Sequence, residues 1–419
     1  MRFGSATRSD AEVVVVGAGP AGASCAFWLA LCGHEVIVLE KKRLPREKTC
    51  GDGLTPRAVH ELATIGIDPA SRGWHRVDGL RATAGELTVE LPWPSHPVYP
   101  PYGYVVRRKD LDLAVAEAAG KAGALILEGV EALAPMVERG AVRGVVAKEA
   151  AGGERVFRSQ VLVVADGANS RIGRALGAAR RRSLPFGMAI RGYVTSPLHD
   201  DRWLESCLDI RDRHGRSLPG YGWVFPLGDG WLNVGVGLLS TYRYWRSVNT
   251  TRLYESYVES LPTRWRVGPH SDRTAPVGGK LPMGGSVSPT SGDGWLAIGD
   301  AAASINPFNG EGIDYAYETG RLAAQVLDRA LRRGRPDDLH LYPNLVVDRY
   351  GDYWRTGRQF ARLIGDPRVM RVLTRVGLRS PRLMSWVLRI MANLLRPGVR
   401  SPAEVTYELI ERIAVVIPE

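Results

Sequence analysis

Val13-Val14-Val15-Val16-Gly17-Ala18-Gly19-Pro20-Ala21-Gly22 joins a run of four valines directly to a glycine-rich turn. An uninterrupted run of β-branched residues is typical of a strand that is buried on both faces. Small and apolar residues continue to position 31 and predict a helix, and residues 34–40 predict a second strand. The segment therefore predicts a β-α-β unit, the opening of a Rossmann-type nucleotide-binding domain.

The glycines of this turn have the G-x-G-x-x-G spacing. Gly17 permits the tight turn, Gly19 lets the backbone approach a pyrophosphate, and Gly22 lets helix and strand pack closely. Glu40, at the end of the second strand, can accept hydrogen bonds from ribose hydroxyls and disfavours the 2′-phosphate of NADP, so we expect FAD or NAD. The expected contacts are Gly17, Gly19, Pro20, Ala21, Gly22, Glu40 and Lys41.

Composition excludes several other classes of protein. The 419 residues are 45% hydrophobic and 24% charged, as in a globular chain with two or more domains. No stretch offers 20 apolar residues for a membrane span, and no signal peptide is recognisable, so we expect a cytoplasmic protein. The cysteines and histidines show no metal-ligand spacing, so we expect no metal. The whole net charge of +11 comes from residues 329–400, which contain sixteen arginines and five aspartates. Because the rest of the chain is neutral, this charge does not indicate that the main body binds a nucleic acid.

Two further predicted strands end in glycine and aspartate residues. Residues 161–165 are followed by Asp166-Gly167, and residues 295–298 by Gly299-Asp300 and then a glycine-containing segment, Pro307 to Gly312. Together with the first glycine turn and Arg108, these motifs resemble those of the FAD enzymes built like aromatic-ring hydroxylases, over roughly residues 11–330. The resemblance implies FAD as the cofactor, with Arg108 near its pyrophosphate.

The same resemblance places an aspartate like Asp300 on the ribityl chain. A helix that begins near Gly312 would direct its N-terminal N–H groups and positive dipole end at a ligand beside it, where reduced flavin is an anion. Pro307 would offer an apolar face to the flavin ring. The expected cofactor residues beyond the first glycine turn are Cys50, Gly51, Arg108, Asp166, Gly167, Gly299, Asp300, Pro307, Asn309, Gly310 and Gly312.

Between the nucleotide-binding motifs, short alternating runs separated by Gly, Pro and Asp predict an antiparallel sheet. We expect a discontinuous FAD-binding domain (residues 11–79, 105–187 and 277–330), an inserted substrate domain (80–104 and 188–276) and a C-terminal basic helical region (331–419). The fold class is α/β. In the inserted domain, Tyr221, Trp223 and Phe225 share one face of a strand by alternation, either as a hydrophobic substrate wall or as core of the sheet.

A closer resemblance is to the geranylgeranyl reductase family of FAD-dependent oxidoreductases. It is carried by the Y-x-W-x-F-P stretch from Tyr221 to Pro226 and by the cysteine segment Cys50-Gly51-Asp52-Gly53-Leu54-Thr55-Pro56-Arg57. Within the family the chain is most similar to the actinobacterial menaquinone reductases, and the likeness fades beyond about residue 335. The resemblance implies that reduced flavin saturates a double bond in the isoprenoid chain of a lipid, with menaquinone as the expected substrate.

Saturating an isolated alkene needs a hydride from flavin and a proton from an acid. Cys50 could stand beside the ring as donor, Tyr221 is a rival, and a protonated buried acid is a third candidate. The sequence has no second strand-linked G-x-G-x-x-G unit, so the electrons come from NAD(P)H that docks transiently or from another carrier. The alternative function is an FAD monooxygenase or halogenase acting on an aromatic small molecule, and a non-enzymatic FAD-bearing adaptor is a third possibility.

The basic C-terminal region predicts two amphipathic helices. Arg368, Arg371, Arg375 and Arg379 recur at helical spacing, and after Pro381 a second polar stripe includes Arg389. Such helices either pack on the body of the protein or lie in a membrane interface with arginines on anionic headgroups. A lipid substrate favours the membrane reading, which would place the protein peripherally at the inner face of the cell membrane. Its protein partners are not indicated.

Overall fold

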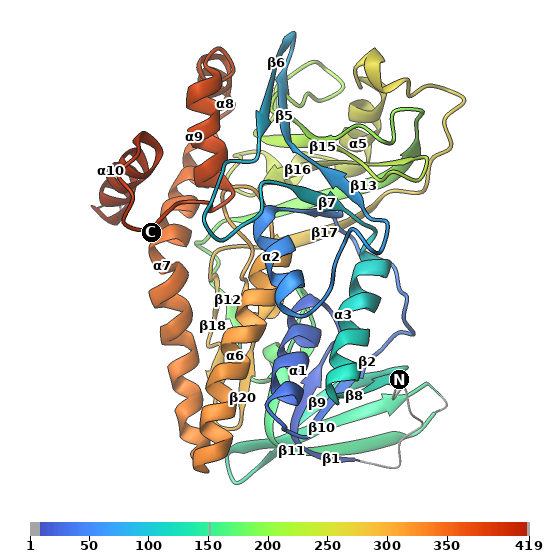
Figure 1. The fold of residues 1–419 in the computed structure, drawn as a ribbon, viewed down its shortest axis with the longest axis vertical. Helices are drawn as coiled ribbons and strands as arrows, with labels where there is room; N and C mark the ends of the chain where they lie inside the picture. Colours follow the sequence, from blue (N-terminus) through green and yellow to red (C-terminus); the bar gives the residue numbers. More distant parts are fainter. Residues whose placement is uncertain (1–8, 151, 417–419) are drawn as a thin grey trace.

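The computed structural model describes residues 9–150 and 152–416 and contains two large β-sheets, one in the lower and one in the upper half of Figure 1. The chain begins with the predicted unit of β1 (Asp10–Val16), α1 (Pro20–Leu31) and β2 (Val36–Glu40). β1 lies between β2 and β11 (Glu154–Val164), parallel to both, and its valines are buried. The run of valines is therefore a central strand, as the pattern predicts.

The first sheet has eight strands and is mainly parallel. β2 pairs with β8 (Leu125–Glu128), and β11 pairs with β20 (Trp295–Ala297), all in parallel. Antiparallel strands extend the sheet beyond this core, and a single short helix follows β11. These elements are β19 (Ser291–Gly292), β9 (Val130–Glu138), β10 (Ala141–Glu149) and α4 (Arg171–Ala175).

Three helices cover one face of the first sheet: α1, α3 (Arg108–Ala122) and α6 (Ile313–Arg333) (Figure 1). Val13 and Val15 pack into the cluster that these helices form, whereas Val14 and Val16 pack on the opposite face. A Cβ atom at Gly320 of α6 would lie 2.6 Å from the carbonyl oxygen of Ala21, so a side chain there would push the two helices apart. This close approach sets the N-terminus of α6 near the glycine turn.

The second sheet has seven strands and is antiparallel except where β14 pairs with β5. It begins at residue 79 and includes residues 277–282, which pair with residues 186–191. The sheet thus extends past the expected boundary at residue 276, because the edge strand continues its pairing. The strands in spatial order are β17 (Val277–Pro282), β13 (Phe186–Thr195), β16 (Trp231–Leu239), β15 (Gly220–Pro226), β14 (Trp203–Cys207), β5 (Gly79–Ala84) and β6 (Leu87–Pro92).

Smaller elements connect the two sheets. A three-stranded sheet of β3 (Gly53–Leu54), β7 (Gly103–Val105) and β4 (His75–Val77) lies between them, and α2 (Pro56–Thr64) follows β3. Helix α5 (Thr250–Glu259) packs on the second sheet. The remaining elements are β12 (Ala179–Arg180), β18 (Val287–Ser288), η1 (Trp245–Ser247), η2 (Thr263–Trp265), η3 (Gly299–Ala302) and η4 (Pro336–His340).

The C-terminal region consists of α7 (Leu341–Leu363), α8 (Pro367–Gly377), α9 (Pro381–Met391) and α10 (Pro402–Val416) (Figure 1). Helix α9 packs on the body, with Met384 and Leu388 buried against the second sheet. Arg389 is turned inward and donates to the carbonyl oxygen of Ser95. Leu395, four residues beyond α9, packs against an aromatic cluster that includes Tyr353 and Trp354.

Helix α8 differs from α9 because several of its apolar side chains are exposed. Thr374 and Gly377 face the body, whereas Val372, Leu373 and Val376 are between 44% and 60% exposed. The amphipathic pattern therefore predicts both helices, but only in α9 is the apolar face mainly packed against the body of the protein. No helix among the described residues is long and apolar enough to cross a membrane.

The difference between α9 and α8 can be tested by stability. Leu388→Ala should lower the free energy of unfolding by about 2–4 kcal/mol, because it leaves a cavity under α9. Val376→Ala on α8 should change it by no more than about 0.5 kcal/mol, because the side chain is already exposed. Urea denaturation followed by circular dichroism measures both, and equal losses would contradict the packing of α9.

Candidate active site

The glycine turn between β1 and α1 is closed by backbone contacts that leave no space for side chains. Gly17 has a φ of +104°, and a Cβ atom there would lie 2.5 Å from the carbonyl oxygen of Ala165. A Cβ atom at Gly22 would lie 2.0 Å from the carbonyl oxygen of Gly17. Gly19 is the N-cap of α1, and Pro20 and Ala21 form its first turn. The N-terminal N–H groups of α1 are therefore available to an anion such as a pyrophosphate.

Glu40 is buried at the end of β2, beside this turn. Its carboxylate accepts hydrogen bonds from the backbone N–H of Ala18 (3.1 Å) and from the guanidinium of Arg46 (3.1 Å), which also pairs with the fully buried Asp112 (2.7 Å). Arg46 thus brings a positive charge to the glycine turn. Lys41, expected here from the sequence, is exposed.

Sequence reasoning missed Arg46 and Asp112. The one available signal was the spacing of Arg108 and Asp112, which are four residues apart; both lie on α3 and form an ion pair at 2.9 Å. Arg46 lies in a loop, and its link to Asp112 spans 66 residues, so spacing could not reveal it.

Asp166 and Gly167 follow β11 next to the glycine turn. One oxygen of Asp166 accepts from the backbone N–H groups of Arg171 (2.8 Å) and Ile172 (3.1 Å) at the start of α4. The other oxygen is buried and accepts no hydrogen bond from the described residues, so it is free to accept one from a ligand. Gly167 has a φ of +82° and lies close to the Lys48 ammonium.

Gly299 and Asp300 lie in η3, directly against α1. A Cβ atom at Gly299 would lie 2.6 Å from the side chain of Ala21. Burial raises the pKa of Asp300, and the nearby cations of Lys48 and Arg108 oppose that effect. Motifs that are almost 300 residues apart in the sequence thus meet at one edge of the first sheet. This arrangement fits the phosphates and ribityl chain of FAD.

The segment before α6 forms the next wall of the site. Gly312 is the N-cap of α6, and Asn309 donates to the carbonyl oxygen of Met391 (3.0 Å). Gly310 has a φ of +80° and lies near the Tyr221 hydroxyl, which donates to the carbonyl oxygen of Asn309 (2.6 Å). Pro307 is buried, and part of its ring packs on Gly357 of α7.

The loop that carries Cys50 lies on the aromatic face of β15. Tyr221 and Trp223 have ring centroids 5.9 Å apart, and Trp223 and Phe225 6.3 Å. Cβ atoms at Gly51 and Gly53 would lie 3.3 Å and 3.1 Å from the Phe225 ring, so larger residues would lift the loop. Trp223 is only 5% exposed, which is the packed position that the core interpretation expected, whereas Tyr221 and Phe225 are more open.

A buried carboxylate that sequence reasoning did not single out, Asp52, holds this loop. One oxygen accepts from the Tyr193 hydroxyl (2.7 Å) and the Asn233 amide (2.7 Å), and the other from the backbone N–H of Arg108 (3.2 Å). Burial raises the pKa of Asp52 to about 6, and the hydrogen bonds from Tyr193 and Asn233 oppose the effect. Arg191 and Asn233 also donate to the carbonyl oxygen of Cys50.

The two predicted proton donors are close to this network. Burial raises the pKa of the Cys50 thiol, although the guanidinium of Arg108 opposes it. Burial likewise raises the pKa of Tyr221, and Glu311 and Cys50 act in the same direction. Both groups are therefore neutral at physiological pH, and Glu311 stands close enough to Tyr221 to affect its ionisation. Glu311 is a third acid at the site.

These surfaces define an FAD-dependent oxidoreductase. Residues 10–204 match the family described as "FAD binding domain". The chain is 43% identical to a menaquinone reductase of Mycobacterium tuberculosis, over 92% of each chain. It is 31% identical to a digeranylgeranylglycerophospholipid reductase of Methanopyrus kandleri, over 85% of this chain and 91% of that one.

The fold also agrees with a crystal structure of a geranylgeranyl bacteriochlorophyll reductase-like protein from Thermoplasma acidophilum. The TM-score is 0.76 at 23% identity, and the match covers 98% of this chain and 100% of that one. The protein belongs to the geranylgeranyl reductase family of FAD-dependent oxidoreductases.

The cofactor site can be tested through Asp300. Asp300→Ala should weaken FAD binding about 10- to 150-fold, since a ribityl hydroxyl would lose a charged acceptor that contributes about 1.5–3 kcal/mol. Asp293→Ala, an exposed aspartate in the turn before β20, is the matched control and should bind FAD normally. Titration of apoprotein with FAD, followed by flavin fluorescence, gives both dissociation constants. Equal affinities would remove Asp300 from the cofactor site.

Proposed function

We propose that the protein uses FAD to saturate a double bond in the isoprenoid chain of a lipid, with menaquinone as the substrate. The observation that carries the proposal is the meeting of the Cys50–Gly53 loop, the aromatic face of β15 and the segment before α6. These three surfaces combine an apolar wall with groups that hold protons. The names of the relatives, which specify menaquinone or a digeranylgeranyl lipid, support the same chemistry.

The character of the wall suits an uncharged tail. Tyr221 and Phe225 offer aromatic surface to the site, and Trp223 supports them from the packed position under Gly51. An isoprenoid is recognised through apolar area, at about 0.8 kcal/mol per buried CH₂ group, and needs no charged anchor. The buried carboxylate of Asp52 beside the wall already accepts hydrogen bonds from Tyr193 and Asn233. The wall therefore favours an extended hydrocarbon over a charged substrate.

The proposed electron donor is NAD(P)H that docks transiently. The single glycine turn at Gly17 to Gly22 is assigned to FAD, and the sequence contains no second strand-linked turn of that spacing for a resident nicotinamide. A dihydronicotinamide could then reach the flavin only from outside. If another two-electron carrier took the place of NAD(P)H as the donor, the rest of the proposal would be unchanged.

The proposed location is the inner face of the cell membrane, with α8 as the contact. Arg368, Val372 and Val376 recur every four residues and are all exposed, so they lie on one outward face of α8, and the exposed Arg379 follows in the turn after the helix. Such a face can place its valines at the acyl boundary and its arginines on anionic headgroups. A membrane contact there would give the lipid substrate a short path to the protein.

The reaction is tested without oxygen. Photoreduced protein mixed anaerobically with menaquinone should yield a product two mass units heavier, or heavier still in D₂O because the new C–H bonds carry deuterium. Reduction of the quinone head group also adds two units, so the product is reoxidised in air before mass spectrometry. A gain that disappears on reoxidation, or a product that forms only with oxygen and gains sixteen units, would contradict the proposal.

The membrane contact is tested by flotation with anionic liposomes. Wild-type protein should float and be released at high salt, since each arginine near the surface contributes about 1 kcal/mol of attraction. Arg368→Glu with Arg379→Glu should abolish flotation and retain FAD. Lys121→Glu, in the last turn of α3, with Arg139→Glu, between β9 and β10, makes the same charge change on elements remote from α8 (Figure 1) and should float normally. Equal flotation of the two variants would remove α8 from the contact.

A further inference from the structure

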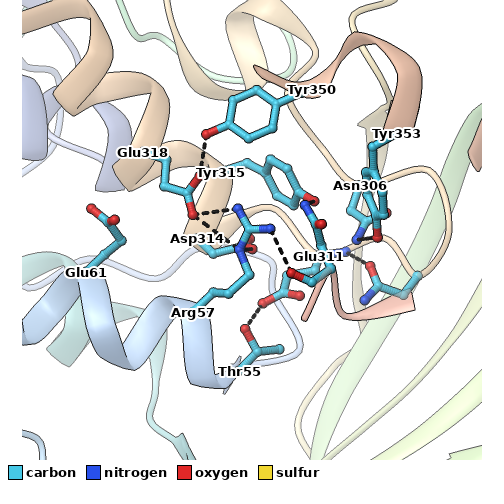
Figure 2. Close-up of polar contacts among 12 residues, drawn as sticks. Thr55, Arg57, Glu61, Asn306, Glu311, Asp314, Tyr315, Glu318, Tyr350 and Tyr353 are labelled. Carbon is cyan, nitrogen blue, oxygen red and sulfur yellow. Dashed lines mark hydrogen bonds and ion pairs between the residues drawn. The ribbon is translucent and has the colours of Figure 1, made fainter. Parts of the chain in front are cut away.

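A cluster of three carboxylates surrounds a single guanidinium beside the site. Glu311 lies just before α6, Asp314 and Glu318 lie in its first two turns, and Arg57 comes from α2 (Figure 2). Asp314 is fully buried, and Glu318 and Arg57 are 2% and 3% exposed. The buried guanidinium of Arg57 cannot by itself neutralise three carboxylates, and a buried charge without a partner is costly. Some of these carboxyl groups must therefore be protonated.

The contacts show which carboxyl group is ionised. Arg57 donates to one oxygen of Glu318 through two nitrogens (3.2 and 2.5 Å), and the Tyr350 hydroxyl donates to the other oxygen. Although burial acts to raise the pKa of Glu318, Arg57 and Tyr350 lower it below its usual value. Glu318 is thus the charge partner of Arg57.

Glu311 and Asp314, in contrast to Glu318, lack strong partners for a negative charge. Arg57 reaches Asp314 at 3.3 Å, but neither oxygen of Asp314 accepts a hydrogen bond from the part of the chain described. Burial and the neighbouring Glu311 raise the pKa of Asp314 well above its usual value. One oxygen of Glu311 accepts from the Thr55 hydroxyl, and the other is buried with no hydrogen-bond partner in the described chain. Asp314 therefore holds its proton at neutral pH, whereas Glu311, whose pKa burial raises to about 7, gains and loses its proton near that pH.

The position of Glu311 separates it from the rest of the cluster. Its own N–H donates to the side chain of Asn309 (2.9 Å), the residue whose carbonyl oxygen holds Tyr221. Figure 2 shows its carboxyl group between Thr55 and Arg57, with Asp314 and Glu318 on the far side. Glu318 lies towards the surface, where Arg349, half exposed, approaches it at 3.9 Å. The cluster thus runs from the proposed site of reaction towards solvent.

We propose that Glu311 is the acid that protonates the isoprenoid double bond, and that Asp314 lies next to it on the path by which this proton is replaced. The inference rests on the proposed function. A hydride with its electron pair adds to one alkene carbon from reduced flavin, and the O–H proton of Glu311 adds to the other. The π bond is replaced by two C–H bonds, and Glu311 is left as a carboxylate. Two electrons come from a dihydronicotinamide, and the replacement proton comes from water through the cluster.

The chemistry of the three candidates favours Glu311 over Cys50 and Tyr221. An effective general acid has a pKa near the working pH. Burial raises the pKa of Glu311 to about 7, with the hydrogen bond from Thr55 acting against it, whereas burial moves the Cys50 thiol and the Tyr221 hydroxyl further above neutrality. The carboxylate that forms in the reaction keeps its donor, Thr55, and lies near the positive charge of Arg57. Cys50 and Tyr221 then shape the site beside it.

The direction of the pH dependence follows from these contacts. The protonated form of Glu311 is the active one, so saturation should be constant at low pH and fall as the pH rises through its pKa. The charged and titratable groups that face Glu311 are Arg57 from α2, Asp314 and Glu318 from α6, Tyr221 from β15 and Tyr353 from α7. Thr55→Val removes a hydrogen bond to the carboxylate, so it should raise the pKa and move this fall to higher pH.

The test compares Glu311→Gln with Glu61→Gln. Glu61 is a matched control because it is 3% exposed on the neighbouring α2 and is ion-paired with Arg321 at 2.6 Å. Glu311→Gln should bind FAD and accept electrons from dithionite normally, but saturate menaquinone in a single anaerobic turnover at least about 100-fold more slowly. Glu61→Gln should saturate it at the wild-type rate. Glu311→Asp should recover part of the lost rate.

A second measurement does not depend on turnover. Infrared spectra of FAD-bound protein below pH 7 should contain a D₂O-sensitive protonated-carboxyl band from Glu311 beside that of Asp314, and Glu311→Gln should remove only the Glu311 band, whereas Glu61→Gln retains both. Absence of the Glu311 band in the wild type, or a Glu311→Gln variant as fast as the wild type, would overturn the role of Glu311 while the reductase stands. A wild type that forms no saturated product overturns the proposed function itself, and the role of Glu311 with it.

Discussion

The carboxylate of Asp52, buried where the two sheets meet, is the constraint on which the site depends. A charged or hydrogen-bonding group without exposure must have its partners in place, and those of Asp52 come from three separate elements. Tyr193 belongs to β13, Asn233 to β16, and the N–H of Arg108 to the first turn of α3. If the second sheet or α3 moved relative to the loop, the carboxylate of Asp52 would lose hydrogen bonds while it stayed buried. Asp52 also has a φ of +66°, a conformation that aspartate tolerates better than most residues.

Several consequences follow for the residues around it. Cys50 precedes Asp52 and has its carbonyl oxygen held by Arg191 and Asn233, while Thr55 follows and donates to Glu311. The glycines on each side of Asp52 let the loop lie flat on the aromatic strand. The same anchored segment thus contacts the proposed substrate wall on one side and the proposed acid on the other. A shift of the loop would disturb both.

Local patterns were sufficient to predict the nucleotide-binding unit. The valine run, the glycine spacing and Glu40 lie within 28 residues, and contacts inside this stretch, such as β1 with β2 and Gly22 with Gly17, set much of their geometry. The likeness of short motifs predicted the family, and the alternation of β15 placed Tyr221, Trp223 and Phe225 on one face. The roles assigned to individual site residues stay predictions.

Pairings between distant segments could not be read from spacing. Arg46 meets Asp112, Asp52 meets Tyr193 and Asn233, and Arg57 meets Glu318, each across 66 to 261 residues. A buried acid among the candidates for proton donor was expected, but nothing in the sequence singled out Glu311. The amphipathic pattern of α8 and α9 was likewise the same in both helices, and only tertiary packing distinguished them. Periodicity identifies an apolar face but not what covers it.

A crystal structure of the protein with FAD bound would test this account most directly. It predicts that the flavin ring lies between the Cys50–Gly53 loop and the segment before α6, with Tyr221 and Glu311 both at its edge and Asp52 still bonded to Tyr193. A flavin ring bound elsewhere, with Glu311 separated from it by the body of α6, would contradict the central claim that the loop and the buried acid form one reaction site.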